Sequence, residues 1–161
     1  MIKQNNKKIL LLILVFIFLI LIFAYFIEYI LGHKPCSLCL YERIPYFLSI
    51  LLIAKLLFFN GYEKIILLIL FFIFVASSIL AFYHFGIEQG FFSETLICEA
   101  KNQTENLSKE QLLEQLKINS ISCKDVSFKI FGFSLASINT IFSFILFVIF
   151  FQLYKKYEIN K

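Results

Sequence analysis

The stretch ILLLILVFIFLILIFAYFIEYIL, residues 9–31, and the stretch PCSLCLYER, residues 35–43, together decide how this chain folds. The first is apolar throughout except for one acid, Glu28, near its end. About 20 apolar residues, each rising about 1.5 Å along a helix, cross the roughly 30 Å of hydrocarbon in a bilayer. The second stretch places Cys36 and Cys39 directly after that run, where a membrane would meet water.

The composition indicates an integral membrane protein. Of the 161 residues 60% are hydrophobic and only 16% are charged, too few to cover a soluble domain of this size. The mean hydropathy is +0.85. The net charge is +4, but no basic cluster accompanies a nucleic-acid-binding motif, so we expect no nucleic-acid partner.

Four apolar segments predict four transmembrane helices, at about residues 9–31, 40–59, 65–85 and 134–154. The strictly apolar part of the second begins only at Ile44, so its helix must start earlier, near Leu40, or the bilayer must thin locally. Pro45 would also suit a first helical turn beginning at Ile44. The first segment is too long for the core of a signal peptide and no cleavage site follows it, so we expect it to be retained.

The fold expected from these segments is a single all-α integral membrane domain, residues 1–161, with two outer loops at 32–43 and 86–133. Its orientation follows from the basic residues outside the spans. Seven of them fall on one side, which the positive-inside rule makes cytoplasmic. They are Lys3, Lys7, Lys8, Lys64, Lys155, Lys156 and Lys161. Both termini are then cytoplasmic.

The long outer loop has its own predicted feature. Ser108 to Gln111 matches a capping box, and leucines at helical spacing follow it. We therefore predict a short amphipathic helix, Lys109–Ile118, lying on the membrane lipid or over the bundle, with an ordinary loop helix as the alternative.

All four cysteines fall in the outer loops, Cys36 and Cys39 in the first, Cys98 and Cys123 in the second. An even number of cysteines confined to the extracytoplasmic side is typical of disulfide chemistry. A Cys-x-x-Cys pair lowers the pKa of one thiol, and the nearby Arg43 and a helix N-terminus favour the thiolate further. If the helix starts near the pair, Cys39 and Arg43 share a face as i and i+4.

Simpler interpretations of these residues stay open. The first pair could be a static disulfide or half a zinc site, although zinc normally recruits a second close-spaced pair, which is absent here, so we expect no metal. Arg43 could be an interfacial anchor. Cys98 and Cys123 could be a structural staple contributing roughly 3–4 kcal/mol, or a second, exchanging disulfide.

Four titratable residues lie near the outer helix ends and are functional candidates by their depth. His84 is the strongest, because a histidine could manage the protons of a quinone. The others are Glu28, His33 and Glu88.

Three segments resemble the disulfide bond formation protein B (DsbB) family of bacterial quinone-linked thiol oxidases. They are KPCSLCLYERIP at 34–45, YHFGIE at 83–88 and FGFSLASIN at 131–139. The first is highly specific and the others moderately so. With the loop cysteines, the resemblance runs from about residue 28 to 143. The connection between the second and third spans is very short, and the outer loop sequence is distinctive.

The resemblance implies an inner-membrane enzyme that reoxidises a periplasmic thioredoxin-like, DsbA-like oxidase and passes the electrons to ubiquinone or menaquinone. The DsbA–DsbB–quinone pathway keeps the bacterial periplasm oxidising. By motif position, Cys39 would be the thiolate that faces the quinone, with Arg43 beside the quinone ring and Cys36 as the disulfide partner of Cys39. Cys98 would form the mixed disulfide with the soluble protein, and Cys123 would resolve it.

Two alternatives to that function stay open. In vitamin K epoxide reductase-like enzymes the loop cysteines precede the Cys-x-x-Cys pair, whereas here they follow it, so the order favours a DsbB-like enzyme. A small structural membrane protein with two static disulfides is the alternative that is not an enzyme. Its disulfides would have reduction potentials below about −300 mV, whereas exchanging pairs are more oxidising.

Overall fold

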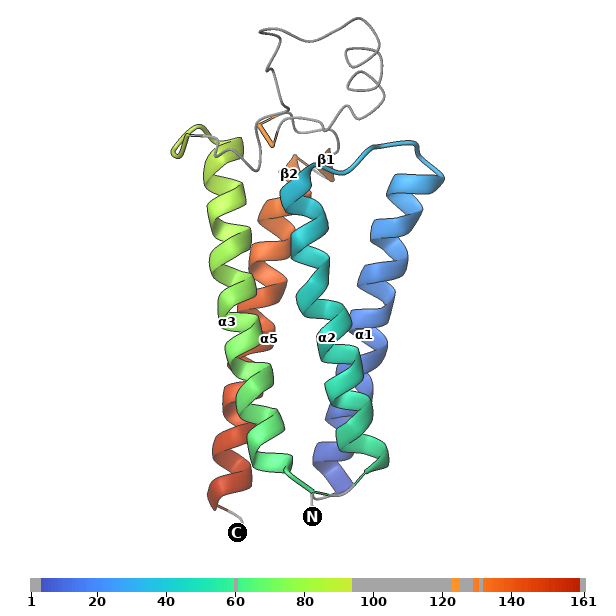
Figure 1. The fold of residues 1–161 in the computed structure, drawn as a ribbon, viewed down its shortest axis with the longest axis vertical. Coiled ribbons are helices and arrows are strands. Elements are labelled where there is room, and N and C mark those ends of the chain that lie inside the picture. The colour runs from blue at the N-terminus through green and yellow to red at the C-terminus, as the bar shows by residue number, and fades with distance from the viewer. Residues whose placement is uncertain (1–3, 60, 94–122, 125–128, 131, 160–161) are drawn as a thin grey trace, which may run out of the picture.

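The structure is a computed structural model, which describes residues 4–59, 61–93, 123–124, 129–130 and 132–159. Four long helices run side by side as an elongated bundle (Figure 1). They are α1 (Gln4–Tyr29), α2 (Ser37–Phe58), α3 (Glu63–Glu88) and α5 (Leu135–Ile159). All four are long and apolar enough to cross a membrane. The predicted all-α class and the four spans are confirmed.

α3 and α5 form the most closely packed pair of helices. α3 packs along α5, and α2 packs against both α1 and α3. The buried core includes Ile17, Ile53, Leu70, Phe74 and Phe150. The outer faces are apolar as well; Leu12, for example, is 71% exposed. In water such a surface would aggregate, whereas in a bilayer it contacts lipid.

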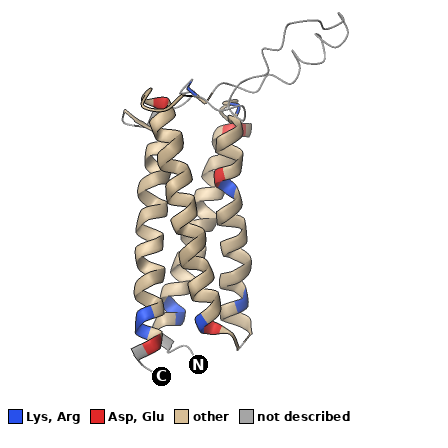
Figure 2. Ribbon diagram, turned by 60° about the vertical axis from the view of Figure 1, so that its left-hand side comes forward, with Lys and Arg blue, Asp and Glu red and all other residues tan. Residues whose placement is uncertain are grey.

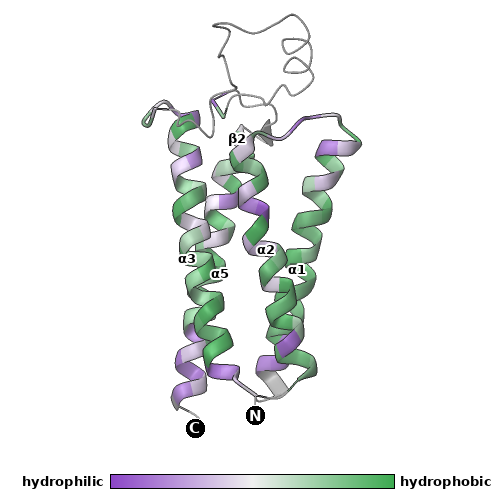
Figure 3. Ribbon diagram, viewed as in Figure 1, coloured by the Kyte–Doolittle hydropathy of each residue, from purple (hydrophilic) through white to green (hydrophobic). Residues whose placement is uncertain are grey.

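Charge and hydropathy divide the bundle along its length. Lysines gather at the end that carries both termini (Figure 2). Hydrophilic residues mark both ends, and a hydrophilic turn also lies in the upper part of α2, within the otherwise apolar bundle (Figure 3). That turn contains Glu42, which is buried.

The helix boundaries differ from the expected ones near the cysteines. α2 begins at Ser37, earlier than Leu40 and well before Ile44, because Cys36 caps its N-terminus. Pro45 therefore lies inside the helix, and Ser49 Oγ donates to the Pro45 carbonyl at 2.6 Å. α3 extends to Glu88 rather than stopping near residue 85.

A minimal hairpin, which the sequence did not predict, leads into α5. Strand β1 (Lys129–Ile130) pairs antiparallel with β2 (Phe133–Ser134), with Ile130 opposite Phe133. Gly132 in the turn has φ +88, a backbone conformation that glycine adopts without strain. Ser134 then accepts a hydrogen bond from the Ser137 backbone N–H at 3.2 Å, which caps the start of α5. The predicted amphipathic helix Lys109–Ile118 lies outside the described residues.

The chain folds back tightly after α3. The Gly86 carbonyl accepts hydrogen bonds from the backbone N–H groups of Phe91 and Phe92, at 2.8 and 3.2 Å. The Phe92 ring stacks on Tyr83 with centroids 5.5 Å apart. A Cβ on Gly86 would lie 2.2 Å from that ring, so the absence of a side chain at Gly86 is what permits this close approach.

We predict that Gly86→Ala lowers the free energy of unfolding by about 1–3 kcal/mol, because the new methyl group must displace the Phe92 ring. Thermal unfolding in detergent measures it. In a Phe92→Ala background the same substitution should cost much less, since the clash is gone. An equal cost in both backgrounds would contradict the contact.

Candidate functional site

Cys36 and Cys39 lie where α2 begins, at the end of the bundle opposite the two termini (Figure 1). Cys36 is the N-cap of α2, and its Sγ accepts a hydrogen bond from the backbone N–H of Cys39 at 3.2 Å. The two sulfurs are 2.7 Å apart, and both cysteines are free thiols. Cys36 is buried and Cys39 is half-buried. The N-terminal turn of a helix therefore holds the pair and directs an N–H dipole at Cys36.

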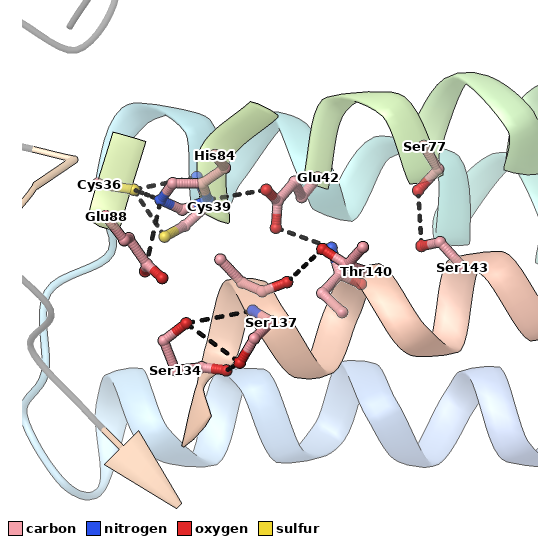
Figure 4. Close-up of polar contacts among 12 residues, drawn as sticks. Cys36, Cys39, Glu42, Ser77, His84, Glu88, Ser134, Ser137, Thr140 and Ser143 are labelled. Carbon is pink, nitrogen blue, oxygen red and sulfur yellow. Dashed lines mark hydrogen bonds and ion pairs between the residues drawn. The ribbon is translucent and has the colours of Figure 1, made fainter. Parts of the chain in front are cut away.

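His84, from the last turns of α3, links the sulfurs to an acid on α2. Its Nε2 lies 3.5 Å from Cys36 Sγ, and its Nδ1 lies 2.8 Å from Glu42 Oε1 (Figure 4). The histidine is only 2% exposed and Glu42 7%. A carboxylate can only accept a hydrogen bond, so Nδ1 carries the proton in this pair and Nε2 faces Cys36.

Two more polar groups complete the surroundings of this histidine. Asn139 on α5 donates from Nδ2 to the second carboxylate oxygen of Glu42, at 2.8 Å. Glu88, one turn after His84 on α3, places Oε1 3.9 Å from His84 Nε2. Three helices, α2, α3 and α5, thus meet around one buried histidine and one buried carboxylate.

The contacts of Cys36 make Cys36 the acidic thiol of the pair, whereas the resemblance implied a thiolate at Cys39. The hydrogen bond from Cys39 lowers the pKa of Cys36 from 9.0 to about 5; burial opposes this change, and the hydrogen bond and charge of His84 support it. A thiol with so low a pKa is a thiolate at neutral pH, and the thiolate is the nucleophilic form. Cys36 is therefore the sulfur that can attack a disulfide or close one onto Cys39.

A cavity of about 520 Å³ lies beside the two cysteines. Its apolar wall comes largely from α1 and α5, with Phe16, Phe23 and Phe142 among the lining residues. Its polar side includes both sulfurs, His84, Glu42 and the pair Arg43 and Glu28. The volume lies within the usual range for sites that bind small organic molecules.

Arg43 is held in place at the edge of this cavity. Its Nη1 donates to Glu28 Oε2 at 2.5 Å, and its guanidinium lies 4.8 Å from the ring centroid of Tyr25. Both partners are on α1, so Arg43 connects α2 to α1 at the depth of the cysteines. An ion pair and a cation–π contact together fix the orientation of the guanidinium.

The loop cysteines are placed only in part. Cys123 is buried and packs with Cys36, Leu38 and Ile87, and it also lines the cavity. It is disulfide-bonded. Cys98 lies outside the described residues. The structure therefore brings Cys123 close to the first pair, a proximity that exchange between the two pairs would need.

The ligand atoms of Cys36, Cys39 and His84 lie within 4.8 Å of one another, a spacing from which a metal ion could be held. Two sulfurs bound to one tetrahedral zinc would be about 3.8 Å apart. The 2.7 Å between Cys36 and Cys39 is shorter and corresponds to a direct interaction of the two sulfurs. That no metal is bound here stays a prediction.

The structure brings together most of the residues proposed from the sequence. Cys36, Cys39, Cys123, Arg43 and His84 all line the cavity. So do the other three candidates, Glu28, His33 and Glu88. Sequence reasoning missed Glu42, Asn139 and Tyr46 as members of the site. All three are polar residues inside predicted spans, where a polar residue is costly unless it has a partner. Glu42 and Asn139 also lie in segments 34–45 and 131–139, which carry the family resemblance.

Two comparisons with known proteins found matches. A family model described as "Disulfide bond formation protein DsbB" matches residues 6–153. The chain is also similar to "Uncharacterized protein RP370" of Rickettsia prowazekii (strain Madrid E), with 31% identity over 150 residues. That alignment covers 91% of this chain and 87% of the relative. No solved structure matches the chain.

The low pKa of Cys36 predicts how the reduced protein responds to pH. The pKa of the Cys36 thiol is about 5 in the folded protein, against 9.0 for the unfolded chain. Ionisation of Cys36 therefore stabilises the folded reduced protein fully above pH 9.0, and this stabilisation is lost as the pH falls through about 5. The ultraviolet absorbance of the thiolate should therefore titrate with a midpoint near 5. Cys36→Ser should remove this step. A first midpoint near 9.0 would show that Cys36 is an ordinary thiol.

Proposed function

Because this chain belongs to the disulfide bond formation protein DsbB family, we propose that it oxidises the dithiol of a periplasmic protein and passes the electrons to a membrane quinone. Membership in the family makes the chain a multi-pass membrane protein of disulfide bond formation, a thiol oxidoreductase. The quinone, the soluble partner and the orientation are parts of the proposal.

The observation that carries the proposal is a free dithiol on the wall of an apolar cavity at the outer end of a membrane bundle. The cavity residues fit a quinone, since aromatic side chains of α1 and α5 suit an apolar ring, and Arg43 supplies a donor for a ring oxygen. A bound quinone, ubiquinone or menaquinone, would accept two electrons and two protons.

The protein groups have distinct roles in this proposal. Cys39 is one helical turn before Arg43 and faces the quinone, while Cys36 supplies the thiolate that closes the Cys36–Cys39 disulfide. Closing that bond releases two electrons and, counted from the dithiol, two protons. His84 Nε2, 3.5 Å from Cys36 Sγ, is placed to hold one of these protons, with Glu42 stabilising the resulting charge.

The second disulfide would connect this centre to the soluble substrate. We assign Cys98 as the cysteine that forms the mixed disulfide with a thioredoxin-like, DsbA-like oxidase, and Cys123 as its resolving partner. The burial of Cys123 against Cys36 supports a relay between the two pairs by thiol–disulfide exchange. In total, the partner's dithiol and one quinone become the partner's disulfide and one quinol.

The proposed location is the bacterial inner membrane with both termini in the cytoplasm. The lysines near the terminal end of the bundle support this orientation by the positive-inside rule. The cysteine site lies at the opposite end and would face the periplasm, which is an oxidising compartment.

The enzymatic proposal predicts different defects for two variants in one assay. Purified protein in lipid nanodiscs receives the reduced partner and quinone, and the quinone absorbance is followed. Cys39→Ser should abolish turnover, because the disulfide can no longer form. Arg43→Ala should raise the KM for quinone about tenfold and change kcat less, because a hydrogen bond to the bound ring is lost.

Glu28→Gln is the matched control for Arg43→Ala. It breaks the same ion pair but keeps the guanidinium, so the KM for quinone should stay within about twofold. Turnover by Cys39→Ser at the normal rate would overturn the mechanism. An unchanged KM for Arg43→Ala would return Arg43 to the role of an interfacial anchor.

The orientation has a separate test. After mild reduction of intact cells, a maleimide that cannot cross the inner membrane should label the cysteines, because all of them face the periplasm. A cysteine introduced at Lys156, near the C-terminus, should stay unlabelled until the cells are permeabilised. Labelling in the reverse pattern would place the site in the cytoplasm.

A further inference from the structure

A line of polar side chains continues from the catalytic site into the interior of the bundle. Beyond Glu42 and Asn139, it passes through Tyr46, Ser143 and Ser77. The Tyr46 hydroxyl donates to Asn139 Oδ1, and its oxygen lies 3.2 Å from Ser143 Oγ. Ser143 Oγ lies 3.1 Å from Ser77 Oγ. Figure 4 shows the last of these contacts well away from the cysteines.

Each of three helices contributes two members of this line. Glu42 and Tyr46 are one turn apart on α2, Asn139 and Ser143 one turn apart on α5, and Ser77 and His84 two turns apart on α3. Tyr46, Ser77 and Ser143 are at most 2% exposed, so lipid and water do not reach them. Buried hydroxyls between transmembrane helices need partners, and here they find them in one another.

The direction of each hydrogen bond can be derived from the amide of Asn139. Its Nδ2 is committed to Glu42 Oε2, so its Oδ1 must accept, and Tyr46 donates its only proton there. The Tyr46 oxygen then accepts from Ser143.

The same reasoning extends one step further. Ser143 has used its proton on Tyr46, so its oxygen accepts from Ser77. All these donors therefore point toward the Glu42 carboxylate. Hydrogen bonds aligned in this way polarise and strengthen one another.

We propose that Asn139 and Tyr46 are positioning residues, which hold Glu42 as a carboxylate on His84 Nδ1 and so keep His84 Nε2 directed at Cys36. The ordered thiolate of Cys36 is the expected result. The importance of this thiolate for turnover rests on the proposed function. The positioning by Asn139 and Tyr46 does not, because it is a property of the reduced protein alone.

Several other charged or titratable groups line the same cavity. A change in the pKa of Cys36 must therefore be distinguished from an effect of these groups. From α5, Asn139 is the polar group among the lining residues; the titratable ones come from α1, α2, α3 and the segment before α2. They are Glu28, His33, Lys34, Cys39, Glu42, Arg43, Tyr46, His84 and Glu88. Asn139→Leu substitutes none of these groups; it removes the donor to Glu42 and, with it, the acceptor of the Tyr46 hydroxyl.

The test is a pH titration of the thiolate absorbance of the reduced, full-length protein, without quinone or partner. Asn139→Leu should raise the pKa of Cys36, lowering its ionisation constant about tenfold, because the carboxylate that orients His84 loses a charge-assisted hydrogen bond. Tyr46→Phe should act in the same direction but more weakly, about threefold, since Asn139 keeps its contact with Glu42.

Thr140→Val is the matched control. Thr140 is the next residue on α5, and among the described residues its hydroxyl bonds within its own helix, donating to the Ala136 carbonyl at 2.8 Å. This variant should leave the titration of Cys36 unchanged. If Asn139→Leu and Tyr46→Phe lower thermal stability but titrate like the parent protein, the line of side chains only packs the helices and the proposal is wrong. If Asn139→Leu does not fold, the titration of Cys36 in Tyr46→Phe, compared with the parent protein, decides.

Normal quinone reduction plays no part in this readout. A changed titration in a protein that fails to reduce quinone would support the positioning and contradict the proposed enzyme. An unchanged titration in a variant that still reduces quinone would contradict the positioning and support the proposed enzyme.

Discussion

The hydrogen bond between His84 Nδ1 and Glu42 Oε1 is the contact on which the arrangement of the site depends. It joins the last turns of α3 to the first turns of α2, and the opposite nitrogen of the same ring faces Cys36. In hydrocarbon no water replaces a lost partner, so a buried acid is tolerated only where protein donors reach it. His84 and Asn139 are those donors. The site is therefore assembled only when α2, α3 and α5 pack in one register.

The cavity combines an apolar and a polar surface. Its apolar side, from α1 and α5, suits a molecule dissolved in lipid, and its polar side holds the thiols at the end of the bundle opposite the termini. The pairing of Arg43 with Glu28 limits the cost of placing a charge there. An electron acceptor from the membrane and a thiol substrate from water could thus reach the same pair of sulfurs from different sides.

Much of the site was accessible from the sequence because it is encoded locally. The apolar lengths gave four spans, and Cys36, Cys39, Arg43 and His84 were recognised from one motif and one helix end. The boundaries were less accurate. Cys36 caps α2 with its own sulfur, a cap that a sequence pattern does not reveal, and the helix consequently begins before the expected start near Leu40. Pro45 was compatible with a helix start and instead lies within the helix.

The sequence by itself determined the membrane class, the number of spans and the grouping of all four cysteines in the loops of one side. Each of these follows from counting residues along the chain. Only the tertiary structure decided that Glu42, Asn139 and Tyr46 meet His84, because that depends on how each helix is rotated about its axis. In a bilayer both lipid and neighbouring helices are apolar, so the hydrophobic pattern that fixes helix rotation in soluble proteins is weak. Hydrogen bonds between helices fix the rotation instead, and they exist only after packing.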